Sequence, residues 1–77
     1  MRIRTQDKQR LVKAIEIHIT KDTSKKCYLF ARYSTGTFFY SGECMLGLYP
    51  SMEEAILELD RIQEFFRENQ NGIYEMR

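Results

Sequence analysis

The sequence predicts a small α+β domain in which an antiparallel three-stranded meander packs against one amphipathic helix. Residues 11–20 alternate between apolar and polar side chains, and two aromatic-rich runs follow at 27–34 and 37–46. Apolar residues then recur at three- and four-residue steps over 52–69, the spacing of one face of a helix. Strands joined by short turns pair antiparallel, and the helix then buries its apolar stripe on one face of the sheet. A chain of 77 residues is long enough for one such domain.

The first predicted strand rests on Ile15, Ile17 and Ile19, which alternate with polar residues. The preceding residues 1–10 are polar and basic and have no sustained apolar period. We interpret them as a basic N-terminal arm or a lead-in to the first strand. Residues 11–77 then form a single α+β domain.

The two central strands are separated by Thr35-Gly36, which can form a hairpin turn but does not fix its length. The turn length decides where Cys27 and Cys44 lie. A two- or four-residue loop places them opposite each other, where a disulfide could form, whereas a three-residue loop separates them. Because no secretory signal follows Met1, we expect reduced thiols.

The helix is predicted over about 52–69, because Gly47-Leu48-Tyr49-Pro50 ends the strand pattern and Ser51 with Glu54 forms a capping box ahead of the apolar repeat. Its apolar stripe is Met52, Ala55, Ile56, Leu59, Ile62 and Phe66. The opposite, acidic face is Glu53, Glu54, Glu58, Asp60 and Glu64. Residues 73–76 are long enough for a short fourth strand at the sheet edge.

The formal net charge of +1 conceals a strong asymmetry along the chain. Residues 1–32 hold nine cationic side chains and three carboxylates, a net charge of +6. Residues 33–77 hold three cationic side chains and eight carboxylates, a net charge of −5. Such an asymmetry indicates either an electrostatic docking surface or two halves that share one solvated surface.

Both faces of the central hairpin carry aromatic rings, and a single helix covers only one of them. The second face is predicted to hold Tyr28, Phe30, Arg32 and Phe39. Exposed apolar patches of more than a few hundred Å² mark binding sites, so we expect a partner there, most simply a second copy in a homodimer. The alternative is that residues 1–10 or 46–49 fold back over this face.

Catalytic chemistry is not indicated. His18 is the only histidine, the four glycines are too scattered for a phosphate loop, and neither Cys-x-x-Cys nor His-x-x-x-His occurs. We therefore predict a non-enzymatic protein with no catalytic, cofactor-binding or metal-binding residues. No apolar run approaches the roughly 18 residues needed to span a bilayer, so we expect no membrane partner and a cytoplasmic location.

These observations predict a small protein-interaction or regulatory module that acts by binding, as a homodimer through the open aromatic sheet face. The first alternative is a nucleic-acid-binding protein in which cations contact phosphates and rings stack on bases. Its contact residues would be Arg2, Arg4, Lys8, Arg10 and Arg32. The third interpretation is an inhibitor, of the kind found in mobile elements, that docks its acidic helix on a basic protein surface.

Overall fold

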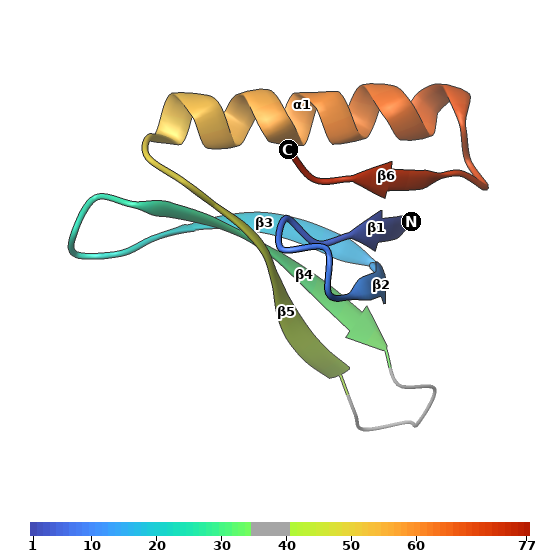
Figure 1. Ribbon diagram of the computed structural model, residues 1–77, viewed down its shortest axis with the longest axis horizontal. Coiled ribbons are helices and arrows are strands. Elements are labelled where there is room, and N and C mark those ends of the chain that lie inside the picture. Colours follow the sequence, from blue (N-terminus) through green and yellow to red (C-terminus); the bar gives the residue numbers. More distant parts are fainter. Residues whose placement is uncertain (35–40) are drawn as a thin grey trace.

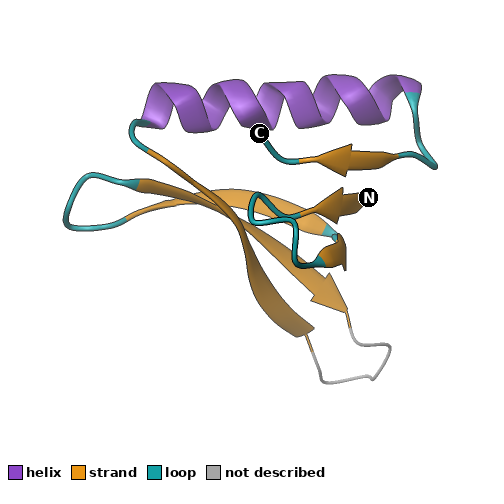
Figure 2. Cartoon of the chain, viewed as in Figure 1, coloured by secondary structure: helices purple, strands orange, loops and turns teal. Residues whose placement is uncertain are grey.

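The computed structural model describes residues 1–34 and 41–77 and shows the small α+β domain that the sequence predicts (Figure 1, Figure 2). The elements of this part of the chain are β1 (Arg2–Arg4), β2 (Leu11–Lys13), β3 (Glu16–Lys21), β4 (Cys27–Ser34), β5 (Ser41–Tyr49), α1 (Met52–Glu68) and β6 (Ile73–Glu75). The strands form two three-stranded sheets, with the orders β3-β4-β5 and β2-β1-β6.

The β3-β4-β5 sheet is the predicted antiparallel meander, but its third strand is displaced. We predicted this strand at 37–46, whereas β5 spans Ser41–Tyr49. Residues 37–40 lie outside the described part of the chain. A β-bulge at Leu46 adds one residue to the strand. Because a bulge interrupts the period-two alternation, residues 47–50 resemble a strand end in the sequence although the strand continues.

The register of β4 with β5 separates the two cysteines. Cys27 lies opposite Tyr49, and Cys44 lies opposite Ala31. Both thiols are free and buried, so the cross-strand disulfide that a short turn would have allowed is not formed. The predicted Thr35-Gly36 turn lies outside the described residues.

The second sheet contains a strand from the segment that we interpreted as an arm or a lead-in. Strand β1 is central: it pairs antiparallel with β2 and parallel with β6. In all three strands the middle residue (Ile3, Val12 and Tyr74) is buried and its neighbours are exposed. A three-residue strand between charged residues has too little periodicity to be recognised in a sequence.

The predicted strand over 11–20 is in fact two strands, β2 and β3, joined by a bend. Before the bend the even-numbered Val12 and Ala14 are buried; after it the odd-numbered Ile17 and Ile19 are partly buried. The bend therefore changes the phase of the alternation by one residue. Ile15 lies at this point and is 56% exposed, unlike the two isoleucines with which we grouped it.

Helix α1 begins where the sequence predicts and ends one residue earlier. The Ser51 side chain accepts a hydrogen bond of 3.2 Å from the backbone N–H of Glu54, which satisfies one of the free donors at the helix start. The predicted faces need correction at three positions. Met52 and Ile56, assigned to the apolar stripe, are exposed, whereas Glu58, assigned to the acidic face, is fully buried.

The helix and the second sheet pack on the same, inner face of the β3-β4-β5 sheet (Figure 1). The buried core draws on every one of these elements except β3: Ile3, Val12, Ala14, Cys27, Leu29, Ala31, Cys44, Leu46, Tyr49, Ala55, Ile62, Tyr74 and Met76. Ile17 and Ile19 of β3 are partly buried and pack against it. Since β1, Leu46 and Tyr49 contribute to this inner core, neither segment that we considered as a cover lies over the other face.

Candidate binding surfaces

Nine side chains form the outer face of the β3-β4-β5 sheet, which we call the open face. Strand alternation and register arrange them in three rows across the sheet. The rows are Glu16, Arg32 and Glu43; His18, Phe30 and Met45; and Thr20, Tyr28 and Leu48. The first row is charged, and the other two are largely aromatic or apolar.

The rings of the open face support one another. His18 stacks on Phe30, with ring centroids 6.0 Å apart and planes 16° apart, and the Tyr28 ring lies 6.1 Å from Phe30. The Tyr28 hydroxyl donates a 2.9 Å hydrogen bond to Asp22 in the β3–β4 turn. Hydrogen bonds from Ser24 and Tyr28 lower the pKa of Asp22, and the same Asp22 contact raises the pKa of Tyr28. The turn thus holds Tyr28 in place.

The charged row contains two carboxylates and one guanidinium. An Arg32 guanidinium nitrogen lies 3.0 Å from a Glu16 carboxylate oxygen. The two ring nitrogens of His18 lie 3.8 Å from Glu16 and 3.7 Å from Glu43. His18 Nδ1 is buried and has no hydrogen-bond partner among the described residues. This row therefore presents both signs of charge side by side.

The predicted partner residues Tyr28, Phe30 and Arg32 do lie together on the open face. Phe39 lies outside the described residues. Two apolar residues that we did not predict join them: Met45 is 48% exposed and Leu48 is 39% exposed. The β-bulge hid them, because it places an odd-numbered and an even-numbered residue on the same face.

The outer face of the second sheet has a different character. Six side chains alternate outward from its three strands in two rows, Leu11, Arg4 and Glu75 and then Lys13, Arg2 and Ile73. Lys8, in the turn between β1 and β2, lies beside them. We call Arg2, Arg4, Lys8 and Lys13 the basic face. It holds four cations, and one carboxylate, Glu75, lies among them.

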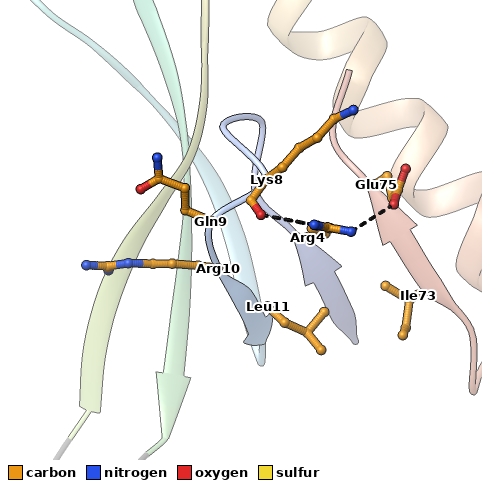
Figure 3. A pocket seen from close by; sticks show the side chains of 7 residues that line it. All are labelled: Arg4, Lys8, Gln9, Arg10, Leu11, Ile73 and Glu75. Carbon is orange, nitrogen blue, oxygen red and sulfur yellow. Dashed lines mark hydrogen bonds and ion pairs between the residues drawn. The ribbon is translucent and has the colours of Figure 1, made fainter.

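Arg4 is held at the centre of a shallow hollow of about 480 Å³ (Figure 3). Its guanidinium donates to the Lys8 carbonyl at 3.2 and 3.3 Å and lies 3.6 Å from a Glu75 oxygen. Lys8 has a positive φ of 65°, which turns its carbonyl into this position. Figure 3 also shows that Arg10 points away from Arg4, towards β5, where it lies 3.7 Å from the Cys44 sulfur.

The structure divides the predicted nucleic-acid contacts between surfaces. Arg2, Arg4 and Lys8 lie together, and Arg10 lies at their margin. Arg32 belongs to the open face of the other sheet and is paired with Glu16. The stacking platform and the basic residues therefore do not form one continuous site.

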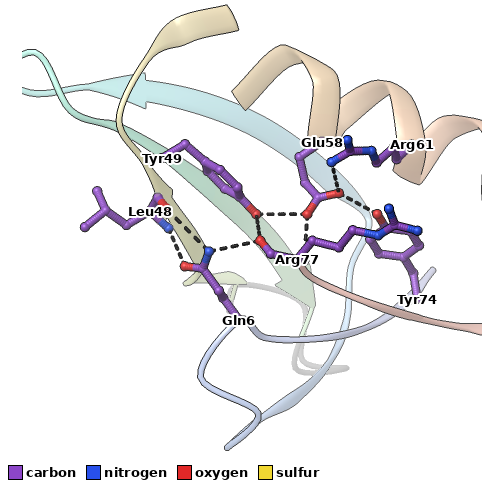
Figure 4. Close-up of polar contacts among 7 residues, drawn as sticks. All are labelled: Gln6, Leu48, Tyr49, Glu58, Arg61, Tyr74 and Arg77. Carbon is purple, nitrogen blue, oxygen red and sulfur yellow. Dashed lines mark hydrogen bonds and ion pairs between the residues drawn. The ribbon is translucent and has the colours of Figure 1, made fainter. Parts of the chain in front are cut away.

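A buried polar network, which the sequence analysis missed, ties the two sheets to the helix (Figure 4). Glu58 is 0% exposed, and its carboxylate accepts hydrogen bonds from Tyr49 on β5 at 3.1 Å and from Tyr74 on β6 at 2.5 Å. It also accepts one from the backbone N–H of Arg77 at 2.7 Å. A buried carboxylate needs such partners, because its desolvation is otherwise very costly.

The two tyrosines are strongly affected by this environment. Burial, reinforced by the hydrogen bond to Glu58, raises the pKa of Tyr74 to about 12. Burial and the charge of Glu58 raise the pKa of Tyr49 as well. Both phenols thus remain hydrogen-bond donors well above the pH at which an exposed tyrosine ionises.

The burial of Glu58 changes the predicted acidic face. Glu53, Glu54, Asp60 and Glu64 are exposed as predicted. A signal for Glu58 was present in the sequence: it follows Ala55 by three residues and precedes Ile62 by four, so it lies within the apolar stripe. Its buried partners come from β5 and β6, which periodicity cannot reveal.

Among the described residues, no group of three or more His, Cys, Asp or Glu side chains is placed to hold a metal ion. In the same part of the chain, no helix is both long and apolar enough to cross a membrane. Comparison with protein-family models, curated proteins and solved structures finds no match to this chain. The function is therefore argued from the surfaces themselves.

Proposed function

We propose that this protein is a non-enzymatic interaction module that self-associates through the open face. The observation that carries the proposal is the pair of rows around Phe30, where aromatic and apolar side chains lie on a face turned away from the core. Contiguous apolar surface of this kind is removed from water when a partner binds.

The charged row favours a second copy over a strongly charged partner. A two-fold interface must be complementary to itself, which requires both signs of charge within it. Arg32 between Glu16 and Glu43 meets that requirement, since one copy's arginine can face the other copy's carboxylates. An acidic or basic partner would favour a row of one sign.

The size of the face sets the expected affinity. Strands lie about 4.8 Å apart and rise about 3.4 Å per residue, so nine side chains cover roughly 300 Å² in projection. A standard interface takes about 800 Å² from each partner, and smaller ones belong to transient complexes. We therefore expect a weak dimer, with a dissociation constant in the micromolar range or above.

The test compares two equally exposed apolar residues. Met45→Glu on the open face should abolish self-association, measured by sedimentation equilibrium up to about 200 µM, a range suited to transient interfaces. Ile56→Glu is the control, because Ile56 is 45% exposed but lies on the helix. Circular dichroism establishes that both variants are folded.

Two results would contradict the proposal. One is a wild-type chain that remains monomeric over the whole concentration range. The other is a dimer that dissociates with Ile56→Glu and persists with Met45→Glu, which would move the interface to the helix.

A further inference from the structure

We infer that the basic face of the β2-β1-β6 sheet binds the phosphate backbone of a nucleic acid, a function separate from self-association through the open face. The ligand chemistry is a row of phosphodiesters. Three features of this face support the inference: the placement of the cations by the strands, the absence of ion-pair partners for three of them among the described residues, and the positions of the apolar residues around them.

The fold concentrates cations that are spread along the sequence. Arg2 and Arg4 both point outward from the central strand, about 7 Å apart by strand geometry. Lys13 lies directly opposite Arg2 on β2. A face built on paired strands holds these charges at fixed spacing, so little conformational entropy is lost when phosphates bind.

Within residues 1–34 and 41–77, three of these four cations have no ion-pair partner. Of the basic face, only Arg4 makes an ion pair among the described residues, with Glu75. The same residues provide no carboxylate within ion-pair distance of Arg2, Lys8 or Lys13. Free cations release condensed counterions from a nucleic acid when they bind it, and this release drives association.

The pattern of apolar residues favours a nucleic acid over a membrane surface. Leu11 and Ile73 are both exposed, but they occupy opposite corners of the two rows, with the arginines between them. Membrane-binding surfaces gather apolar side chains on one side so that they can enter the bilayer together. Separated corners do not provide such a patch, whereas arginine forks match phosphate oxygens.

Fluorescence anisotropy with labelled 20-mers tests the inference, using single-stranded DNA, single-stranded RNA and duplex DNA at low salt. We expect binding that weakens with added salt. Three free cations predict a log–log slope of about −2 for a single strand and about −3 for a duplex. The salt slope is therefore expected to be steeper for the duplex oligonucleotide than for the single-stranded ones.

The decisive comparison uses two variants with the same change in charge. Arg2→Gln with Lys13→Gln should weaken binding at least tenfold and bring the salt slope close to −1, because about one contact is left. Lys21→Gln with Lys26→Gln, around the β3–β4 turn, is the control and should remain within about threefold of the wild type. Arg32→Gln should also leave binding unchanged, because Arg32 lies on the other sheet.

The inference is overturned if no oligonucleotide binds at about 25 mM salt, or if both double variants weaken binding equally. It is also overturned if vesicles containing anionic phosphatidylserine bind while the oligonucleotides do not. Because Met45→Glu leaves the basic face intact, failure of the dimer and failure of nucleic-acid binding are separate outcomes.

Discussion

The two sheets share one core but present opposite kinds of surface. The outer face of β3-β4-β5 carries two aromatic and apolar rows beside a row of two carboxylates and one guanidinium. The outer face of β2-β1-β6 carries four cations and one carboxylate, and its two apolar residues are separated. The β3-β4-β5 sheet, with its longer strands, is therefore suited to burial against a partner. The β2-β1-β6 sheet, with its shorter strands, is suited to binding an anion.

This difference explains the charge asymmetry of the sequence. Many of the N-terminal cations lie on or beside the second sheet, whereas Glu53, Glu54, Asp60 and Glu64 lie on the exposed helix. Opposite charges are thus separated onto different surfaces of one small domain. A near-neutral chain can in this way carry a strongly positive face.

The largest expected effect comes from breaking the link between the sheets. Glu58→Ala removes the acceptor that Tyr49, Tyr74 and the Arg77 N–H share. The Tyr49 hydroxyl keeps the Arg77 carbonyl as an acceptor, at 2.9 Å, so two buried donors are left unpaired. Each costs about 1 kcal/mol or more, so we expect a loss of about 2 kcal/mol in the free energy of unfolding. Urea denaturation followed by circular dichroism measures it.

The matched control is Glu64→Ala on the same helix. Glu64 is exposed and, in the part of the chain that the structure describes, forms only an i,i+3 ion pair with Arg67. Its loss should therefore change stability by less than about 0.5 kcal/mol. An equally small effect of Glu58→Ala would contradict the prediction. It would mean that apolar packing alone, and not the polar network around Glu58, holds the two sheets together.

Alkaline pH tests the same link from the side of the tyrosines. An unfolded tyrosine ionises near pH 10, whereas the pKa of folded Tyr74 is about 12 and that of Tyr49 is also raised. The contribution of these two tyrosines to stability should therefore be constant below pH 10 and fall as the pH rises from 10 towards 12, because only the unfolded chain loses their protons there. The slope is at most about 1.4 kcal/mol per pH unit for each tyrosine.

Single variants show which sheet depends more on the link. Tyr49→Phe removes the β5 donor and Tyr74→Phe the β6 donor, and each should flatten the fall in stability between pH 10 and 12. Urea denaturation at pH 8, 10 and 11 provides the comparison. An unchanged slope in the double variant would mean that other groups cause the alkaline loss.

The sequence predicted the meander and the helix because both are long enough to show their period. It could not predict β1 and β2, each only three residues long, nor the bend at Ile15 that changes the phase. The register of the hairpin depends on how side chains fit across β4 and β5. The Tyr33 ring lies so close to Gly42 that a Cβ there would come within 2.5 Å of it, and only glycine accommodates this contact.

The surfaces were predictable to a different extent. Alternation alone placed Tyr28, Phe30 and Arg32 on one face, because the extra residue of the bulge lies in β5 and the alternation along β4 is uninterrupted. Met45 and Leu48 were missed because the bulge in β5 changes which residues face outward. Lys13 was missed as part of the basic face because only the pairing of β1 with β2 brings it opposite Arg2.

The smallest expected effect separates the ring of Tyr28 from its hydroxyl. Tyr28→Phe keeps the ring on the open face and removes the hydrogen bond to Asp22. Because that bond helps to lower the pKa of Asp22, the variant should raise this pKa towards its ordinary value, which NMR titration of the side-chain carboxyl measures. The stabilisation from a lowered carboxyl pKa is fully present above the unfolded pKa and is lost as the pH falls to the folded pKa. The variant has less of this stabilisation, so its acid unfolding should begin at slightly higher pH.

Self-association should survive in Tyr28→Phe, because burial of the ring, and not the hydroxyl, drives the contact between open faces. Sedimentation of Tyr28→Phe beside Met45→Glu therefore distinguishes an apolar interface from a polar one. A Tyr28→Phe chain that stays monomeric would show that the hydrogen bond to Asp22, which fixes the ring, is itself required for self-association. Binding through the open face would then depend on polar groups held in place, as we infer for the second sheet.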